Sequence, residues 1–380
     1  MSTIYNYKIY TSASHLPLEW DILAENNIFL SKSYLAVLEE APPENMQCHF
    51  IGLYCNGKLC GIAVSQYIDL SSIATFKDRK KRFCIKDYFF KKFSSHTLII
   101  GNNTLTGQNA YLFGENLPER QGLALLLKAI HKLKEQYKDK GIAINLLAIK
   151  DFNDSEWPCF EKAGYKRYYK FSTQPNMIFN IRKHWSSLED YITDLNTKYR
   201  TQYNRARKKA AGITKRKFTE NDINENAQRI SELYTTVANR ASFNTFFLPA
   251  NHFYTLKQKL GDNFRFYGYF LDDRLVGFST LIKNGHNMDT YFLGYDEKIQ
   301  KENLLYLNML YDMAAYAIKK DYRHIIFARS AMEIKSSVGA EAEKVYGLIK
   351  HTNPLINLFI GKLFRYFDPE IQWKPRSPFK

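Results

Sequence analysis

The sequence has no long hydrophobic run. None of its 380 residues lies in an apolar stretch approaching the roughly 18 to 20 residues that a membrane-spanning helix needs. The first ten residues, Met1 to Tyr10, also lack the apolar core of a secretion signal. We therefore expect a globular protein located in the cytoplasm.

Cysteine is scarce, and neither cysteine nor histidine is spaced as in a metal site. The chain has 5 cysteines and 9 histidines with no Cys-x-x-Cys and no His-x-x-x-His, so we expect no metal. An odd number of cysteines suits a reducing compartment. A turn centred on the Asn-Gly pair at 56–57 would place Lys58, not Cys60, opposite Cys55, which predicts no disulfide between the two cysteines.

Acidic residues are too few to balance the basic ones. There are 54 Lys and Arg against 38 Asp and Glu, which gives a net charge of +16. This excess predicts an anionic partner, either nucleic acid, an acidic membrane surface or a phosphorylated substrate. Disorder is excluded because 45% of the residues are hydrophobic. The chain is longer than one hydrophobic core usually supports, so two domains are expected.

A repeat indicates how these domains are built. The sequence FIGLYCNGKLCG at 50–61 matches FYGYFLDDRLVG at 266–277 in its first Phe and Gly, its polar turn pair, a basic residue, Leu and a final Gly. Each copy predicts a β-hairpin, since apolar runs flank a turn pair that tolerates positive φ.

The same order of elements follows each hairpin. We expect an extended segment, a helix with apolar residues at helical spacing and a further strand. These segments are 97–113, 117–138 and 142–149 in the first half, and 287–295, 303–320 and 324–328 in the second. A helix that connects two strands favours their parallel pairing.

The first half also contains an insertion. The first hairpin lies 216 residues before the second hairpin, but the first helix lies fewer residues before the second helix. The first half must therefore contain extra residues between its hairpin and its helix. We place the insertion at 71–96, where basic residues alternate with aromatic ones such as Phe83, Phe89 and Phe90. This composition suits an anionic bilayer surface, and an amphipathic helix docked on its own domain is the alternative.

The order hairpin, strand, helix, strand resembles the GNAT acyltransferase fold, and two copies in tandem resemble its Fem-like branch. The segment KYRTQYNRARKKAAGI at 198–213 looks like the basic helix that opens the second Fem-like domain, and RSAMEIKSSVGA at 329–340 is similar to segments at the mouth of the acyl-transfer cleft. The resemblance implies an α/β class with mixed sheets. Each of two tandem GNAT-like domains would have a mainly antiparallel sheet with a splayed parallel pair, flanked by helices.

The domain limits follow from the resemblance. We assign 1–182 to the first domain and 183–380 to the second, which opens with a basic helix at 188–211 and is expected to be the catalytic one. GNAT acetyltransferases hold the coenzyme A pyrophosphate with a Gly-rich helix start. The loop YDEKIQKEN at 295–303 has no glycine, whereas ERQGLA at 119–124 keeps Gly122, which we assign to cofactor binding together with Lys208 of the basic helix.

Acyl transfer to an amine needs a base and donors for an oxyanion. The resemblance to GNAT proteins implies that the oxyanion donor is a backbone amide of the third strand, near 291–295. Glu333 and Asp289 are the candidate bases, and Tyr291 is a candidate for protonating the leaving group. A salt bridge or helix-end charge is the alternative for the acids, and core packing is the alternative for the tyrosine.

Several cationic and aromatic residues are candidates for substrate binding. Arginine recognises carboxylate and phosphate with two parallel hydrogen bonds, and lysine acts as a point charge. The candidates are Arg329, Lys335, Tyr295, Arg200, Tyr203 and Arg207. Solvated surface charge is the alternative for the basic ones.

These features predict an N-acyltransferase. The donor would be a long-chain acyl-CoA or an acyl-carrier protein, used as co-substrate without a permanently bound cofactor. The acceptor would be the amine of a lipid or cell-envelope precursor at the inner face of the membrane. The run 353–367, which carries Lys362 and Arg365 among phenylalanines, adds to the expected contact with an anionic membrane. Closure over a hydrophobic acyl tunnel and docking on the core of the second domain are the alternatives for this run.

Two other functions remain open at this stage. The first is a Fem-type ligase that uses aminoacyl-tRNA and acts on a peptidoglycan precursor, in which case tRNA is the partner. The second is a GNAT-like protein that binds without catalysis.

Overall fold

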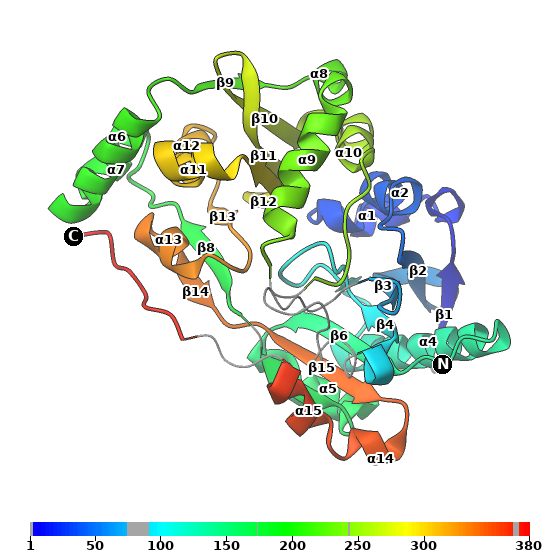
Figure 1. Ribbon diagram of the computed structural model, residues 1–380. Coiled ribbons are helices and arrows are strands. Elements are labelled where there is room, and N and C mark those ends of the chain that lie inside the picture. The colour runs from blue at the N-terminus through cyan, green and yellow to red at the C-terminus, as the bar shows by residue number, and fades with distance from the viewer. Residues whose placement is uncertain (1–2, 74–90, 173, 242–243, 368–371) are drawn as a thin grey trace. The chain divides into compact units, whose positions relative to one another are not determined.

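The computed structural model describes residues 3–73, 91–172, 174–241, 244–367 and 372–380 (Figure 1). The chain forms two compact units, and each contains one mixed sheet. Unit 1 comprises 1–173, 242–249 and 344–370, and unit 2 comprises 174–241, 250–343 and 371–380. The expected α/β class is confirmed. The predicted basic insertion at 71–96 lies mostly outside the described residues, including Phe83, Phe89 and Phe90.

Unit 1 has a sheet in the order β1-β2-β3-β4-β6-β15-β7, with the short strand β5 also paired to β3. The pair β4–β6 is parallel and the other described pairs are antiparallel. The strands are β1 (Tyr5–Tyr10), β2 (Met46–Cys55), β3 (Lys58–Asp69), β4 (His96–Ile100), β5 (Tyr111–Phe113), β6 (Leu146–Phe152), β7 (Tyr169–Ser172) and β15 (Tyr346–His351). The helices are α1 (Trp20–Leu23), α2 (Lys32–Glu40), α4 (Glu119–Asp139), α5 (Trp157–Phe160), α14 (Pro354–Asn357) and α15 (Ile360–Phe367).

Unit 2 repeats this plan with the order β14-β8-β13-β12-β11-β10-β9, in which β12–β13 is the parallel pair. The strands are β8 (Asn176–Asn180), β9 (Thr214–Lys217), β10 (Phe264–Leu271), β11 (Arg274–Asn284), β12 (Asn287–Tyr295), β13 (His324–Ile326) and β14 (Glu341–Glu343). The helices are α6 (Leu188–Asp194), α7 (Thr197–Lys209), α8 (Glu220–Glu225), α9 (Ala227–Ala238), α10 (His252–Leu260), α11 (Glu297–Asn303), α12 (Leu305–Lys319) and α13 (Met332–Ser337).

The two predicted hairpins, β2–β3 and β10–β11, have the same geometry. Both turn pairs, 56–57 and 272–273, have positive φ throughout. In each hairpin the pairing register shifts by one residue at the same distance from the turn, between Leu53 and Tyr54 in β2 and between Tyr269 and Phe270 in β10. The equivalent pairs around this shift are Leu53–Gly61 and Tyr269–Gly277. Equivalent turns and bulges at corresponding positions support an internal duplication.

The register shift overturns the cysteine prediction. Tyr54 pairs with Leu59 and Leu53 with Gly61, so Cys60 is the extra residue of a β-bulge. The Cα atoms of Cys55 and Cys60 lie 5.9 Å apart and a disulfide joins the two side chains. The prediction failed because it assumed an uninterrupted ladder.

Each sheet includes a strand from the other half of the sequence. Strand β15 lies between β6 and β7 in unit 1, and β8 lies between β13 and β14 in unit 2. Residues 344–370 thus belong to unit 1 and 174–182 to unit 2, which differs from the division at 182/183 expected from the sequence. Strand exchange leaves no signal in local patterns, because it depends on pairing between distant segments.

Apolar periodicity explains the long helices. Helix α4 buries Leu123, Leu126 and Leu133 against the sheet of unit 1. Helix α12 buries Leu307, Leu310, Ala314 and Ala317 in unit 2. None of the described helices has the combination of length and apolar character needed to cross a bilayer.

Candidate functional site

The parallel strands β12 and β13 separate in the middle of the unit 2 sheet. Their last pair is Asp289 with Ile326, and β12 continues to Tyr295 alongside β11. Just past this point Tyr291 and Phe292 form a β-bulge opposite Thr280, whose hydroxyl donates to the Phe292 carbonyl at 2.5 Å. Bulges next to strand separations often redirect side chains at active sites.

Asp289 lies at this separation and is buried. Its side chain is 6% exposed, and its Oδ2 has no hydrogen-bond partner among the described residues. Burial raises the pKa of Asp289 to about 7, and a hydrogen bond with Asn284 opposes that shift. A carboxyl group with this pKa can both take up and release a proton near neutral pH.

A histidine that the sequence analysis did not single out lies beside Tyr291. His252 is fully buried at the start of α10, its Nε2 is 2.9 Å from the Tyr291 hydroxyl, and the two rings stack with centroids 5.8 Å apart. Its neighbour Phe253 packs on Phe266 and Phe278 of the sheet, which sets the position of α10. No spacing in the sequence relates residue 252 to residue 291, so only the tertiary packing could identify this pair.

The corresponding region of unit 1 is filled by its own chain. Strands β4 and β6 pair from Thr97 to Ile100, and the loop 101–110 follows where β12 continues as a strand in unit 2. The Lys150 ammonium donates to the Leu105 carbonyl at 2.7 Å, and the Gly107 amide donates to the Asp151 carboxylate at 3.1 Å. This loop favours unit 2 as the unit that accepts a ligand between its strands.

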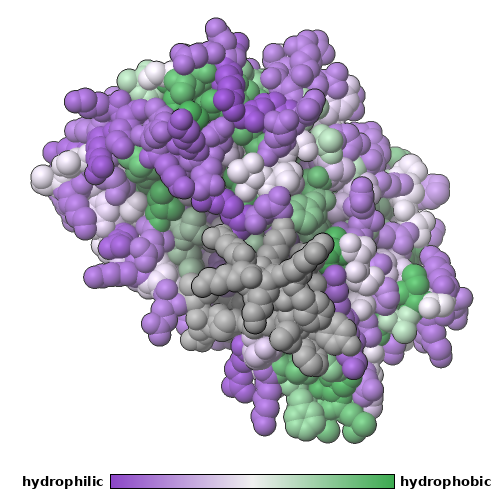
Figure 2. All heavy atoms as spheres, viewed as in Figure 1, coloured by the Kyte–Doolittle hydropathy of each residue, from purple (hydrophilic) through white to green (hydrophobic). Residues whose placement is uncertain are grey.

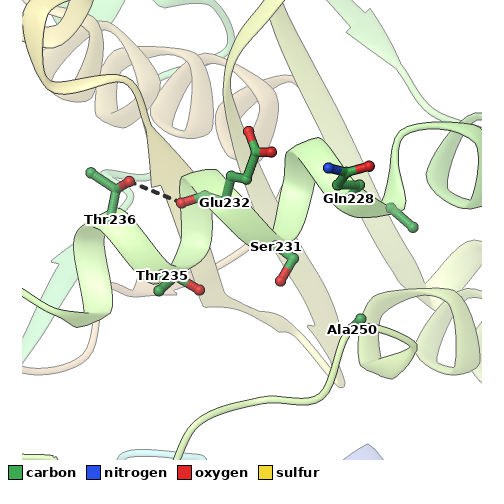
Figure 3. Close-up of a pocket in the computed structure, with 7 residues that line it drawn as sticks. Gln228, Ser231, Glu232, Thr235, Thr236 and Ala250 are labelled. Carbon is green, nitrogen blue, oxygen red and sulfur yellow. Dashed lines mark hydrogen bonds between the residues drawn. The ribbon is translucent and has the colours of Figure 1, made fainter.

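A surface hollow in unit 2 lies elsewhere (Figure 3). Its lining is mainly the outward face of α9: Ala227, Gln228, Ser231, Glu232, Thr235, Thr236 and Ala250. Its single carboxylate, on Glu232, pairs with Arg229 at 2.9 Å. The lining includes neither Asp289 nor Tyr291, so we do not regard this hollow as the site of chemistry.

Comparison with known proteins identifies the fold around this site. Residues 197–336 match the family model described as an acetyltransferase (GNAT) domain. This segment is similar to GNAT acetyltransferase domains. No curated protein sequence matches the chain significantly.

Solved structures extend the likeness to the whole chain. The structure of FemX is 12% identical with a TM-score of 0.53, and the alignment covers 95% of this chain and 100% of that one. A tandem GNAT protein from the clavulanic acid biosynthesis pathway is 11% identical with a TM-score of 0.53, covering 93% and 99%. The expected tandem, Fem-like arrangement of two GNAT-like folds is thereby confirmed, and the family match to residues 197–336 supports the acyltransferase class.

In unit 2 the described residues leave no free anion site at the start of α11, the helix that follows β12. Asp296 caps α11, and its Oδ1 accepts from the amides of Lys298 and Ile299 at 3.0 and 3.4 Å. Its Oδ2 faces Arg274 at 3.2 Å, and Glu297 occupies the first helical turn. Carboxylates stand where a pyrophosphate would need free amides, so a coenzyme A pyrophosphate does not fit there.

Gly122 of unit 1 has a packing role. A Cβ at this position would come within 2.6 Å of the Phe113 ring, and the Gly122 amide donates to the Pro118 carbonyl at 2.9 Å. The amide that we expected to bind a cofactor is therefore used inside the helix.

Glu333 lies on the surface of unit 2. Its carboxylate accepts from Arg376 at 2.9 Å and from the Lys374 amide at 3.3 Å, and these contacts lower its pKa. A more acidic, ion-paired carboxylate is a weaker base, which disfavours the catalytic role predicted from the sequence.

Lys335 is buried and satisfied by backbone. Its ammonium donates to the carbonyls of Phe327, Ala328 and Arg329 at 2.6, 3.3 and 2.6 Å, and burial lowers its pKa to about 7. Three acceptors match the three protons of an ammonium and leave none for a substrate. The loop at the end of β13 is strained, because Ala328, Ser330 and Ala331 have positive φ. Lys335 holds this loop in place, and the half-buried Arg329 is part of it.

The predicted residues of the basic helix serve mainly to attach α7. Arg207 pairs with Asp312 of α12 at 2.7 Å and lies over the Tyr203 ring, and Arg200 donates to the Leu195 carbonyl at 2.9 Å. Lys208, on the same helix, is exposed. Helix α7 packs with α12 and Met288 in one hydrophobic cluster on one face of the sheet. Side chains alternate between the two faces along β12, so Asp289, next to Met288, points to the opposite face from the residues of α7.

Tyr295 also packs on the α12 side. Its ring lies 6.1 Å from that of Tyr306. The structure therefore brings together only Asp289 and Tyr291 of the predicted site, with His252 added.

Proposed function

We propose that unit 2 catalyses transfer of an acyl group from an activated donor to an amine. The carrying observation is the buried carboxyl group of Asp289, which lies where β12 and β13 separate and has a pKa near 7. GNAT domains are acyltransferase domains, and the acid next to the separated strands argues against a protein that only binds.

In this proposal Asp289 takes a proton from the substrate ammonium, and the free amine then attacks the acyl carbonyl. The C–N bond forms as the carbonyl oxygen becomes an oxyanion, which accepts hydrogen bonds from β12 amides beyond the last β12–β13 pair. Collapse of this intermediate breaks the bond to the leaving group, which takes a proton from Tyr291, and the nitrogen of the new amide releases its extra proton, which restores the Tyr291 hydroxyl. His252, 2.9 Å from the Tyr291 hydroxyl, holds that hydroxyl in place.

The proposed donor is a long-chain acyl group on an acyl-carrier protein or on coenzyme A. The carboxylates of Asp296 and Glu297 at the start of α11 favour the carrier protein, because its phosphopantetheine has no pyrophosphate. The net charge of +16 suits an acidic donor protein. The enzyme can be assayed with two donors that carry the same acyl chain, one on acyl-carrier protein and one on coenzyme A, and with the same amine. We expect the higher kcat/KM with the carrier protein.

The proposed acceptor is the amine of a lipid or cell-envelope precursor at the inner face of the cytoplasmic membrane. Mass spectrometry of lipids and cell-wall peptides should reveal an N-acylated product in cells with the gene and not in cells without it. Cells that carry the Asp289→Asn variant should resemble the deletion, since loss of a general base lowers the rate at least about 100-fold. If the variant restores the product fully, Asp289 is not the base.

A second candidate is aminoacyl transfer from tRNA to a peptidoglycan precursor. The exposed Lys198, Arg205, Lys208 and Lys209 of α7 favour it, since clustered cations suit a phosphate backbone. Tight tRNA binding that weakens steeply with salt, and that is lost in Arg205→Gln/Lys208→Gln/Lys209→Gln, would support this candidate over the carrier protein.

A further inference from the structure

Helices α14 and α15 form the outer edge of unit 1, and one side of α15 is fixed to the sheet. Ile360 packs among Leu146, Ala148 and Ile349, and the Phe364 ring lies 4.2 Å from the Phe171 ring. These contacts determine which way the helix faces, so its remaining side chains must point outward.

Helix α14 and the turn that joins it to α15 are unusually apolar on their exposed side. Leu355, Leu358 and Phe359 are 71%, 78% and 57% exposed. Figure 2 shows hydrophobic atoms gathered at the lower edge of the molecule, where Figure 1 places α14 and α15. We call these three residues the apolar edge. Contiguous exposed apolar side chains of this size mark an interaction site.

Cations follow the apolar edge in the chain. Residues 353–367 include no Asp or Glu, and Lys362 and Arg365 are exposed on α15 without an ion pair to any described residue. The Asn357 side chain, in α14, donates to the Arg167 carbonyl at 3.1 Å. Burial lowers the pKa of Lys350, and the nearby charges of Arg167 and Lys134 lower it further, which shows that these cations lie close together.

We propose that α14 and α15 dock unit 1 onto an anionic lipid bilayer, with the apolar edge inserted among the head groups. Exposed Leu and Phe beside Lys and Arg, without acids, match the interface of an anionic membrane. A second copy of the chain would bring like charges together across a symmetric contact, so the charge pattern disfavours it. The proposal does not depend on the acyl-transfer reaction.

Vesicle co-sedimentation tests the proposal. The full chain should bind vesicles with phosphatidylglycerol in phosphatidylcholine and bind pure phosphatidylcholine at least tenfold more weakly. Leu358→Ser/Phe359→Ser should lower the affinity for the anionic vesicles at least tenfold. Lys362→Gln/Arg365→Gln should weaken binding and reduce its dependence on salt, because fewer charges are engaged.

A matched control distinguishes insertion from general stickiness. Leu18 and Ile22 are 88% and 72% exposed at the other end of the unit 1 sequence. Leu18→Ser/Ile22→Ser should bind like the unmodified chain, and circular dichroism should show every variant folded. Equal loss in both double variants, no vesicle binding by the unmodified chain, or a dimer that only Leu358→Ser/Phe359→Ser dissociates would overturn the proposal.

Discussion

Asp289 connects folding stability to pH at the scale of a single residue. Its pKa is about 7 in the folded chain and about 4 for an unfolded aspartate. Between these values the folded state keeps a proton that the unfolded state has released. The free energy of unfolding should therefore contain a contribution that is complete below about pH 4 and is lost as pH rises to about 7, at about 1.4 kcal/mol per pH unit.

Urea unfolding between pH 4 and pH 8 measures this contribution. Asp289→Asn has no titrating group there, so the difference in unfolding free energy between the variant and the unmodified chain should grow with pH and level off above about 7. A difference that stays constant with pH would show that Asp289 is ionised in the folded protein.

Tyr291 is the second residue whose role can be isolated. Tyr291→Phe removes the hydroxyl near His252 and keeps the ring stack, so stability should fall by about 1 kcal/mol. Because the buried His252 nitrogen loses a partner, the cost can reach about 3 kcal/mol. Turnover should fall at least about tenfold if the hydroxyl protonates the leaving group. Tyr295→Phe, which alters a tyrosine that packs on Tyr306, is the control and should keep most activity.

At the scale of elements, the segment 372–380 is attached to α13 and α6. Arg376 pairs with Glu333, the Arg376 amide donates to the Ser336 hydroxyl at 3.1 Å, and the Phe379 ring lies against the Tyr191 ring of α6. Glu333 thus holds a segment of chain in place.

This attachment predicts how Glu333→Gln behaves. The variant should lose the ion pair with Arg376, and hydrogen exchange in 372–380 should increase. Turnover should stay within about twofold, because an exposed ion pair contributes little to the stability of the fold. Exchange measured by mass spectrometry and kinetics on the same preparation check both parts. A tenfold loss of turnover with unchanged exchange would restore Glu333 as the base.

At the scale of the whole molecule, strand exchange makes the two halves of the sequence depend on each other. A fragment of residues 1–182 lacks β15, so β6 and β7 lose the strand between them, and it carries β8 without its partners β13 and β14. Unpaired strand edges promote aggregation. Circular dichroism and size-exclusion chromatography should show an aggregated fragment without cooperative unfolding, whereas the full chain unfolds cooperatively. A monomeric fragment that unfolds cooperatively would contradict this.

The prediction of the fold succeeded where a signal is local in the chain. Turn pairs at 56–57 and 272–273 and apolar periodicity in α4 and α12 are properties of neighbouring residues, so hairpins and helices could be recognised. The site residues stay predictions. Asp289 and Tyr291 were chosen from the third strand, where the structure shows a strand separation, and Glu333 was chosen by its closeness to a strand end, where the structure shows it paired with Arg376.

The sequence by itself determined the order of elements and the duplication, because these depend on local periodicity and on turn chemistry. The acyltransferase class was implied by the resemblance to GNAT proteins. Only the tertiary structure decided which groups meet. It placed His252 beside Tyr291, buried Asp289 until its pKa rose, and used Lys335 and Arg207 inside unit 2. Burial and charge pairing arise from residues far apart in the chain, and a bulge of one residue was enough to bring Cys55 and Cys60 together.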